Sequence, residues 1–257
     1  AEIEDVYAAA KHLQSIKEAP ASISVDTDED IKRYGYRTLT YVVNNARSFY
    51  SYSDRNYEYI GVRGFARLGD YGNRVLQLVD GHSVNDNIYG SFFMGHVFGV
   101  DMDLIKKVEF IRGPGSSLYG NNAVFGAVNV ITKNGKDING FFAKLEGGSY
   151  NTHSGTIAYG KQFKDKYDLL LSASFVNSKG QDLFYPEFAE SSGTNGWARD
   201  VDGEQAHKFF IKAVLGEVTF LANAVSREKS APTAAYETIF NDNRLKTIDE
   251  KFFVELK

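Results

Sequence analysis

From residue 137 onward, apolar and polar side chains alternate with a period of two. In 167–175 every second position is Tyr, Leu, Ala or Phe, and the positions between them include Asp168 and Ser172. The same alternation returns in 141–146, 208–215 and 252–257. Because successive side chains of a strand point to opposite faces, the pattern predicts long antiparallel strands with one apolar and one mostly polar face.

The connections between these stretches alternate in length. The turns at 164–166 and 216–217 are tight, whereas the connections at 177–205 and 227–247 are long. Short turns on one side and long loops on the other are typical of outer-membrane β-barrels, which turn apolar side chains to lipid and polar ones to the lumen. A soluble antiparallel sandwich also alternates. The second half of the chain alone leaves both architectures open.

Composition excludes several other classes. No stretch approaches the roughly 18 apolar residues of a membrane helix, since the nearest, 91–100, is broken by Gly95, His96 and Gly99. With 29 basic and 33 acidic residues the net charge is −4, which disfavours a generic nucleic-acid binder. The absence of cysteine excludes disulfides and thiolate metal sites. Residues 1–6 lack the pattern of an export signal, which we expect to be removed or never present.

Residues 17–136 predict short helices mixed with short strands. Thr27 with Asp30 three residues on forms a capping box, which predicts a helix that Gly35 ends. A second helix is predicted after Thr38 from apolar residues at helical spacing. Strands are predicted at 21–25, 59–63, 108–111 and 127–132, with a hairpin at 75–84 around an Asp-Gly turn. These elements indicate a small α+β domain.

The glycine-rich segment 113–120 resembles a nucleotide-binding loop but lacks its chemistry. A dinucleotide fingerprint needs glycine at residue 118, which is Leu118, and a P-loop needs lysine at residue 121, which is Asn121. We therefore predict a tight turn into a short helix. We expect no nucleotide cofactor.

No metal or catalytic site is predicted either. Asp26, Asp28 and Asp30 have the opening spacing of a calcium loop, but Ile31 replaces the glycine of its sharp turn, so helix capping is favoured. The five histidines are scattered without paired spacing. No serine, histidine and acid combination has local motif support. We expect a protein that is not an enzyme.

Three segments of the first part, in this order and spacing, resemble the plug domain of TonB-dependent outer-membrane receptors. They are Ile-Gly-Val-Arg-Gly at 60–64, the segment 74–86 around Asp-Gly-His, and the segment 103–133 around Ile-Arg-Gly-Pro-Gly. The resemblance is strong over about residues 17–136 and covers the following strands by position and pattern. It implies an α+β plug domain followed by antiparallel transmembrane β-barrel strands.

The resemblance also implies domain boundaries. We expect an N-terminal segment at 1–16 with a possible TonB box, the plug domain at 17–136, and barrel strands at 137–257. In this family the plug fills a barrel of about 22 strands. The residues after Lys136 can supply about six strands of the usual length. We therefore expect a fragment, a plug with the opening strands of a 22-stranded barrel, because an open sheet cannot satisfy its edge in lipid.

By resemblance, ligand recognition lies in the outward-facing plug loops at 50–57, 64–73 and 86–98. The candidate residues are aromatic, guanidinium or imidazole side chains: Tyr50, Tyr52, Arg55, Tyr57, Arg67, Tyr71, Tyr89, Phe92, Phe93 and His96. Such a set suits a large, partly aromatic or anionic chelate. The alternative is that some of these side chains pack against barrel loops.

Two further sets of residues follow from the resemblance. Arg63 and Arg112 are expected to contact the barrel wall through carboxylates, because a buried unpaired charge is costly, with exposure to solvent as the alternative. The N-terminal segment is expected to contact the periplasmic domain of TonB as an added strand. Its candidate residues are Glu4, Asp5, Val6, Tyr7 and Ala8.

The resemblance predicts a TonB-dependent receptor in the outer membrane of a Gram-negative bacterium, active in uptake of a metal chelate. A ferric siderophore is the first candidate cargo and cobalamin the second. The expected partners are TonB, the extracellular chelate and outer-membrane lipid, without nucleic acid. Two other functions stay open: a ligand-sensing receptor without transport, and a soluble β-rich carbohydrate-binding or hydrolase module.

Overall fold

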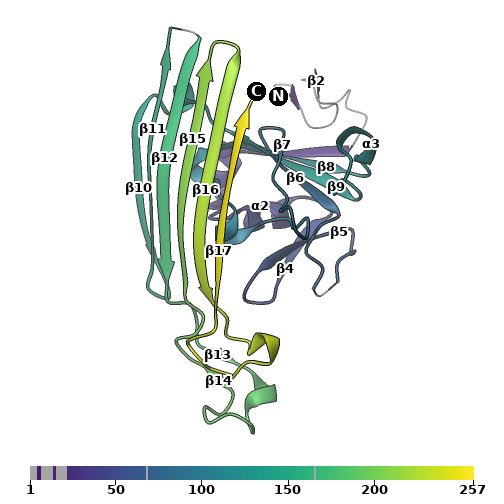
Figure 1. The fold of residues 1–257 in the computed structure, drawn as a ribbon, viewed down its shortest axis with the longest axis vertical. Coiled ribbons are helices and arrows are strands. Elements are labelled where there is room, and N and C mark those ends of the chain that lie inside the picture. The colour runs from purple at the N-terminus through teal and green to yellow at the C-terminus, as the bar shows by residue number, and fades with distance from the viewer. Residues whose placement is uncertain (1–4, 7–13, 16–21, 68, 165) are drawn as a thin grey trace. The chain divides into compact units, whose positions relative to one another are not determined.

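The computed structural model describes residues 5–6, 14–15, 22–67, 69–164 and 166–257 (Figure 1). The chain divides into two compact units. Unit 1 comprises residues 1–52, 58–95 and 102–133, and unit 2 comprises residues 53–57, 96–101 and 134–257. Two short segments from the first part of the sequence therefore group with the later strands. The boundaries expected after residues 16 and 136 stay predictions.

Unit 1 is built on a five-stranded sheet in the order β3-β8-β9-β6-β7. Its strands are β3 (Ser22–Thr27), β6 (Val75–Val79), β7 (His82–Ser83), β8 (Ile105–Arg112) and β9 (Gly126–Thr132). Only the β6–β9 pair of this sheet is parallel. Two smaller sheets pair β1 (Asp5–Val6) with β2 (Gln14–Ser15), and β4 (Phe49–Ser53) with β5 (Glu58–Val62). One core cluster joins β6, β8 and β9 through Leu76, Leu78, Ile111, Ala123 and Ala127.

The helices of the first part begin and end where their capping residues predict. The α1 helix (Asp28–Tyr34) starts at the Thr27–Asp30 capping box and ends at Gly35, whose φ is 66°. The α2 helix (Leu39–Asn45) follows Thr38, and α3 (Ser116–Tyr119) follows the Gly-Pro-Gly turn. Two 3-10 turns, η1 (Gly95–Val97) and η2 (Met102–Leu104), precede β8. Every helix in the described part of the chain is too short or too polar to span a bilayer.

The β4 strand differs from the expectation, because residues 50–57 were predicted as a loop. Tyr50 and Tyr52 lie in β4, which pairs with β5. The ring of Tyr50 covers Gly61, where a Cβ would stand 2.2 Å from the ring carbon Cζ. Only glycine leaves room for this ring, so Gly61 sets the packing of the small sheet.

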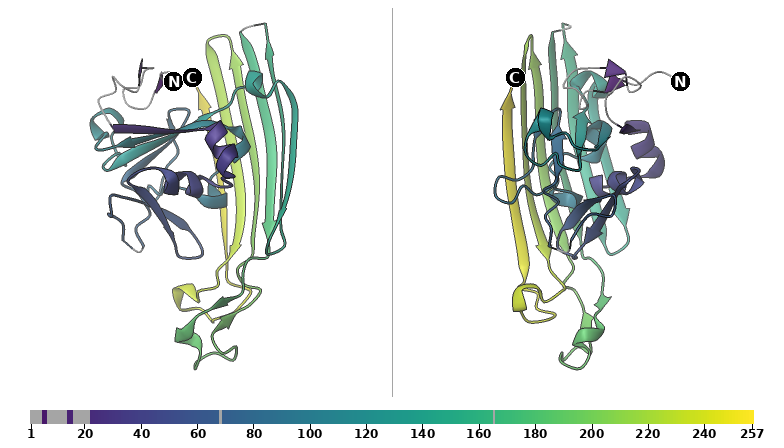
Figure 2. Two further views of the ribbon diagram at one scale, coloured as in Figure 1. Left: turned by 180° about the vertical axis from the view of Figure 1, so that it is seen from behind. Right: turned by 90° about the vertical axis from the view of Figure 1, so that its right-hand side faces the viewer.

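Unit 2 contains one antiparallel sheet of six long strands, in the order β10-β11-β12-β15-β16-β17 (Figure 2). The strands are β10 (Gly140–Gly148), β11 (Thr152–Phe163), β12 (Tyr167–Ser178), β15 (Glu204–Leu215), β16 (Val218–Ser230) and β17 (Lys246–Leu256). The connection 216–217 is a tight turn. The long connection between β12 and β15 contains the hairpin β13 (Leu183–Phe184) and β14 (Trp197–Ala198) with η3 (Pro186–Phe188). The connection between β16 and β17 contains η4 (Ala235–Glu237).

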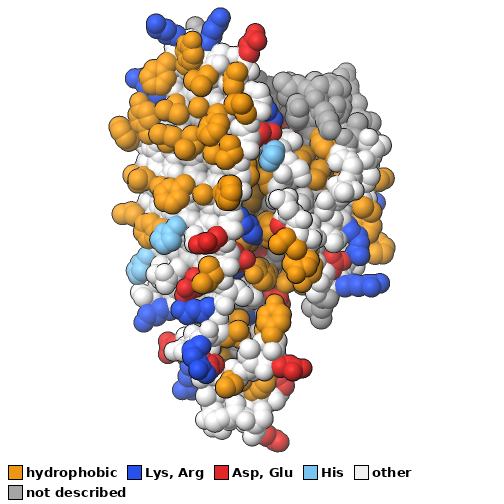
Figure 3. Space-filling model, in the orientation of Figure 1, with side chains coloured by type: hydrophobic (Ala, Val, Ile, Leu, Met, Phe, Trp, Pro, Cys, Tyr) orange, Lys and Arg blue, Asp and Glu red, His pale blue; other side chains and the backbone are white. Residues whose placement is uncertain are grey.

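One face of this sheet is apolar and exposed, as the alternation predicts. Phe141, Leu145 and Phe252 are 90%, 83% and 83% exposed. Their alternating neighbours on the other face include buried charged residues such as Lys212 and Arg227. Figure 3 shows hydrophobic side chains gathered over the outer surface of these strands. A contiguous apolar surface of this kind indicates a face that belongs against lipid or a partner rather than water.

The α4 helix (Gly135–Ile138), which precedes β10, is fixed to the sheet of unit 2. The buried carboxylate of Asp168 in β12 accepts hydrogen bonds from the backbone N–H groups of Gly135 and Lys136, the latter at 2.9 Å. Gly135 also approaches Gly160 of β11, where a Cβ would lie 2.7 Å from the Gly135 carbonyl oxygen. The connection from the first part of the chain therefore meets the sheet at a fixed point.

We predict that Gly160→Ala destabilises the protein by about 1–3 kcal/mol, because the added methyl overpacks a rigid backbone contact. The matched control is Gly147→Ala in β10, where a Cβ meets nothing within 4 Å. Urea unfolding of the complete native protein in lipid vesicles measures both. Equal changes for the two variants would contradict the close packing of α4 on β11.

Candidate ligand-binding site

The turn between β4 and β5 carries two of the predicted ligand residues, Arg55 and Tyr57. Asp54 Oδ1 accepts hydrogen bonds from the backbone N–H groups of Asn56 and Tyr57 at 2.9 and 2.6 Å. Arg55 has a left-handed φ of 70°, and its N–H donates to Ser53 Oγ at 3.0 Å. Local side-chain acceptors therefore set the turn, as they do in Asx turns generally. Other residues of unit 2, from its strands and from the connection before β15, contact every side chain from Arg55 to Tyr57.

Arg227 of β16 is the centre of these contacts and is 5% exposed. Its Nη2 donates to the backbone oxygen of Asn56 at 2.6 Å. Its Nη1 donates to Asp249 Oδ2 at 3.0 Å and its Nε to Glu204 Oε1 at 2.5 Å. The guanidinium carbon lies 5.5 Å from the centroid of the Tyr57 ring. Two carboxylates, a carbonyl and an aromatic face thus compensate the buried charge.

The side chains of Asn56 and Tyr57 are held by β17. The Tyr57 hydroxyl donates to Asp249 Oδ1 at 3.0 Å, and Thr247 Oγ1 donates to Asn56 Oδ1 at 2.7 Å. Burial, together with the charge of Asp249, raises the pKa of Tyr57 to about 12. The phenol therefore stays protonated and remains a donor at every physiological pH.

Arg55, unlike Asn56 and Tyr57, uses only part of its hydrogen-bonding capacity. Its Nη2 donates to Asp202 Oδ2 at 2.8 Å, and the Arg55 side chain is 36% exposed. Within the described residues, its Nε is buried without a hydrogen-bond partner. An unsatisfied buried donor is costly, so this N–H is suited to an acceptor that the described residues do not supply.

His96 lies in the segment 96–101, which also belongs to unit 2. Burial lowers the pKa of its imidazole from 6.5 to about 4, against the opposing effect of the Glu204 carboxylate. The segment is held nearby by Asn223 Nδ2, which donates to the Gly99 carbonyl at 2.6 Å. Thr156 Oγ1 donates to Asp101 Oδ2 at 3.2 Å. His96 is therefore neutral at physiological pH.

In unit 1, Tyr52 and Arg67 lie together. The ring of Tyr52 stacks on Tyr59 with a centroid distance of 5.1 Å. The Tyr52 hydroxyl donates to the backbone oxygens of Arg67 and Asp70, the latter at 3.1 Å. Tyr50 is half-buried in β4, and the Arg67 side chain is exposed. This part of unit 1 joins residues of two predicted ligand loops.

The third predicted loop is divided between surface and interior. Tyr71 and Tyr89 stack with centroids 4.7 Å apart and are 41% and 57% exposed. Phe92 is 2% exposed, and its ring therefore lies inside unit 1. Phe93 exchanges backbone hydrogen bonds with the buried Gln77 side chain, at 2.9 Å from its N–H and 2.7 Å to its carbonyl. Tyr89, stacked on Tyr71 of the second predicted loop, is thus the accessible aromatic residue of this loop.

Arg63 and Arg112 bind neighbours within unit 1. Arg63 is exposed with a φ of 53°, and its N–H donates to the Ser48 carbonyl at 2.9 Å. The Arg112 guanidinium donates to Ser22 Oγ at 2.8 Å and to Ser24 Oγ at 3.4 Å, which fixes β8 to β3. Their contact with a barrel wall stays a prediction. In the N-terminal set, Asp5 and Val6 form β1, while Glu4, Tyr7 and Ala8 lie outside the described residues.

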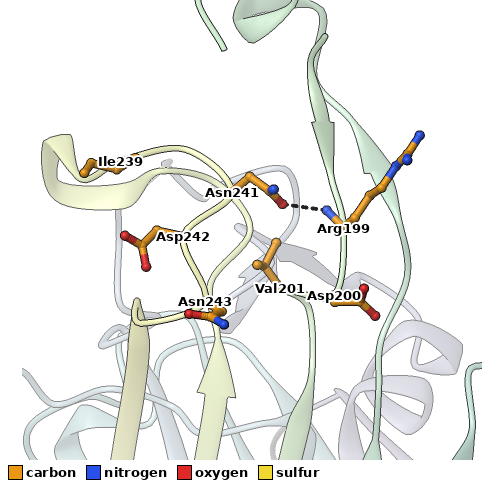
Figure 4. A pocket seen from close by; sticks show the side chains of 7 residues that line it. All are labelled: Arg199, Asp200, Val201, Ile239, Asn241, Asp242 and Asn243. Atoms are coloured by element: carbon orange, nitrogen blue, oxygen red, sulfur yellow. Dashed lines mark hydrogen bonds between the residues drawn. The ribbon is translucent and has the colours of Figure 1, made fainter. Parts of the chain in front are cut away.

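The two long connections of unit 2 line an open cavity of about 390 Å³. Its lining residues come from both connections: Arg199, Asp200, Val201, Ile239, Asn241, Asp242 and Asn243 (Figure 4). The backbone N–H of Arg199 donates to Asn241 Oδ1 at 2.7 Å, which ties one connection to the other. The charged ends of Arg199 and Asp200 point away from Asn243 in Figure 4.

Sequence reasoning did not identify the charged residues of the strands that hold the 53–57 turn. The alternation places Arg227 and Lys229 on the polar face of β16, but their partners depend on register. Arg227 stands opposite Asp249 of β17, and Lys229 stands opposite Glu204 of β15. Opposite charges at these positions are a usable signal only once the strands are aligned. Within the described residues, no group of three His, Asp or Glu side chains is arranged to hold a metal ion.

Comparison with known proteins identifies the class of the first part of the chain. Residues 15–127 match the family model of the TonB-dependent receptor plug domain. The chain is 29% identical over 185 residues to the vitamin B12 transporter BtuB of Vibrio vulnificus, covering 71% of this chain and 29% of that protein. It is 32% identical over 134 residues to the iron-regulated outer membrane virulence protein of Vibrio cholerae, covering 50% and 20% of the two chains.

The fold agrees with this class. The pyoverdine outer membrane receptor FpvA of Pseudomonas aeruginosa PAO1 superposes with a TM-score of 0.64 at 15% identity, over 87% of this chain and 30% of that one. The chain spans less than a third of the length of each of these proteins. Residues 15–127 are thus a TonB-dependent receptor plug domain, and the antiparallel strands that follow have the fold of strands in TonB-dependent receptor structures.

We predict that Arg227→Ala destabilises the protein by about 3–5 kcal/mol, since it leaves Glu204 and Asp249 buried without their partner. Arg244→Ala is the control, because Arg244 forms an exposed ion pair with Asp242 in the nearby connection. Such a surface pair contributes little to the free energy of unfolding, so its removal should leave the urea unfolding midpoint unchanged. An equally small effect of both variants would show that Arg227 is not a centre of the site.

The low pKa of His96 predicts a specific pH dependence. An imidazole of pKa 6.5 in the unfolded chain and about 4 in the folded chain favours folding above pH 6.5, and this contribution is lost as the pH falls toward 4. In His96→Gln the unfolding free energy should therefore decrease less over this range than in the wild type. His207→Gln, at an exposed position of β15, serves as the control substitution. Identical profiles for all three proteins would exclude a neutral His96.

Proposed function

We propose that this chain is part of a receptor in the outer membrane of a Gram-negative bacterium that takes up a metal chelate in a TonB-dependent manner. The observation that carries the proposal is a plug domain followed directly by strands with an exposed apolar face. A soluble carbohydrate-binding or hydrolase module would bury that face in a core. Exposures of 83–90% at Phe141, Leu145 and Phe252 favour lipid as its surroundings.

The ligand contacts we propose are the aromatic and guanidinium groups of the three loops. The stacked pair of Tyr71 and Tyr89 offers rigid aromatic faces, and Arg55 offers a buried N–H donor that has no acceptor among the described residues. Aromatic faces and a cationic donor are the groups that suit a large, partly aromatic or anionic chelate. Tyr57 contributes its ring at most, because its hydroxyl is bound to Asp249.

A ferric siderophore is our first candidate cargo, and cobalamin is the second. Support comes from the relatives, one named as a vitamin B12 transporter and one as an iron-regulated outer membrane protein. Both cargoes are large chelates that a receptor binds and releases unchanged. The proposal therefore includes no bond cleavage and no catalytic residue.

The N-terminal residues 4–8 are the contact we propose for TonB. Asp5–Val6 already forms a short antiparallel pair with Gln14–Ser15. A segment that adopts strand geometry in a two-residue ladder loses little when it pairs with a partner instead. Ligand binding must then shift an equilibrium between two states of this segment, as in any coupling between distant sites.

Growth tests this function. A strain that lacks the receptor gene should regain growth on one ferric siderophore, haem or cobalamin source when it carries the complete native protein. A variant that lacks residues 4–8 should bind the same ligand with unchanged affinity and fail to restore growth, because only the energy coupling is removed. Binding without growth by the wild type would favour a sensing receptor. Growth supported by the deletion variant would place the TonB contact elsewhere.

A further inference from the structure

Asp202 joins more parts of unit 2 than any ligand residue predicted from the sequence. It is 7% exposed and lies just before β15, at the end of the connection 179–203. Its Oδ2 accepts hydrogen bonds from the Gln181 N–H at 3.0 Å and from Arg55 Nη2 at 2.8 Å. Lys229 Nζ donates to Asp202 Oδ1 at 2.7 Å and to its backbone oxygen at 2.9 Å.

These bonds bring four segments to one carboxylate. Gln181 and Asp202 are the two ends of the first long connection. Lys229 also donates to the Ser230 carbonyl at 2.8 Å, where the second long connection begins. Arg55 belongs to the turn between β4 and β5. The approach is close enough that a Cβ on Gly180, whose φ is +72°, would lie 2.1 Å from the Asp202 carbonyl oxygen.

The charge of Asp202 is necessary to this arrangement. Lys229 is 6% exposed, and a buried ammonium group requires an anion nearby. Arg55 donates to the same carboxylate, which orients its guanidinium and leaves Nε as the buried donor without a partner in the described chain. An asparagine could keep the shape but would offer one oxygen and no charge to two cations and an amide.

The position of Asp202 also relates it to the cavity in Figure 4. Three cavity residues, Arg199, Asp200 and Val201, immediately precede it in the chain. The opposite wall, formed by residues 239–243, belongs to the connection that starts beside Lys229. Both walls therefore begin at the same carboxylate.

We propose that Asp202 is a positioning residue of the ligand site. It fixes the bases of both long connections and the direction of the Arg55 guanidinium in a single arrangement. The role of Asp202 in ligand uptake rests on the proposed function. The link among the segments is a property of the protein alone and can be tested without ligand.

Hydrogen exchange of the complete native protein in detergent tests the link. Asp202→Asn should raise amide exchange on the order of tenfold or more in 53–57, 179–203 and 231–245 together, because one charge-assisted group holds all three. Glu190→Gln removes the same charge from an exposed position of the first connection and should change none of them. Faster exchange confined to 179–203 would overturn the proposal, since Asp202 would then only close its own loop.

Two further variants keep the test decisive. Asp202→Glu retains the charge and should restore most of the protection, which a purely steric role would not predict. Should Asp202→Asn fail to fold, Arg55→Gln tests the same link from the other side. Because this substitution removes the guanidinium, it should accelerate amide exchange in 179–203 as well as in 53–57. Unchanged exchange in 179–203 would overturn the proposal.

Uptake then measures the consequence for the ligand. The probes are radiolabelled ferric catecholate, ferric hydroxamate and cyanocobalamin. For the probe that the wild type transports, Asp202→Asn should raise the half-saturation concentration on the order of tenfold, with the maximal rate within about twofold, because the lost contact orients a binding group. An unchanged half-saturation concentration would overturn the positioning role. A wild type that transports none of the probes would instead count against the proposed function, while the exchange result still decides the link.

Discussion

A buried charged side chain on the polar face of a β-sheet requires oppositely charged partners on the neighbouring strands. The contacts of Arg227 in unit 2 depend on this requirement. Its two carboxylate partners come from β15 and β17, so a single guanidinium connects three strands. The third contact, to the Asn56 carbonyl, uses the same cation to hold a turn from a distant part of the sequence. Without the two ion pairs, the free-energy cost of burying the guanidinium would exceed the stabilisation that its hydrogen bond to the turn provides.

The residues of the 53–57 turn have different roles although they are adjacent. Asp54 shapes the turn through its own backbone, and Asn56 and Tyr57 are bound to β16 and β17. Of these turn residues, Arg55 combines an ion pair to Asp202 with an Nε–H that has no hydrogen-bond partner among the described residues. Composition suggested one group of equivalent aromatic and basic ligand residues. The contacts instead separate side chains that hold the loop from a side chain that can still bind something else.

Local signals in the sequence predicted most of the fold. The Thr27 capping box, the Gly35 stop and the Asp-Gly hairpin each depend on residues a few positions apart, and the long strands depend on an alternation that repeats within each strand. The β4 strand was missed because its alternating tyrosines also fit a ligand loop. Asp202 and Arg227 were missed for another reason. Alternation tells which face a residue occupies but not which residue lies opposite, and Arg55 meets Asp202 across 147 positions of sequence.

The edge position of β3 has a mechanical consequence. This strand follows the N-terminal segment and pairs on one side only, with β8, through six register positions from Ser22 to Thr27. A force applied at Ser22 and directed out of the sheet would act on these paired positions one after another. It would act first on the position where the Arg112 guanidinium donates a hydrogen bond to the Ser22 hydroxyl. Strands β8, β9 and β6 each have neighbours on both sides and would resist as a block. The six β3–β8 register positions are therefore the part of the plug sheet that such a pull would separate first.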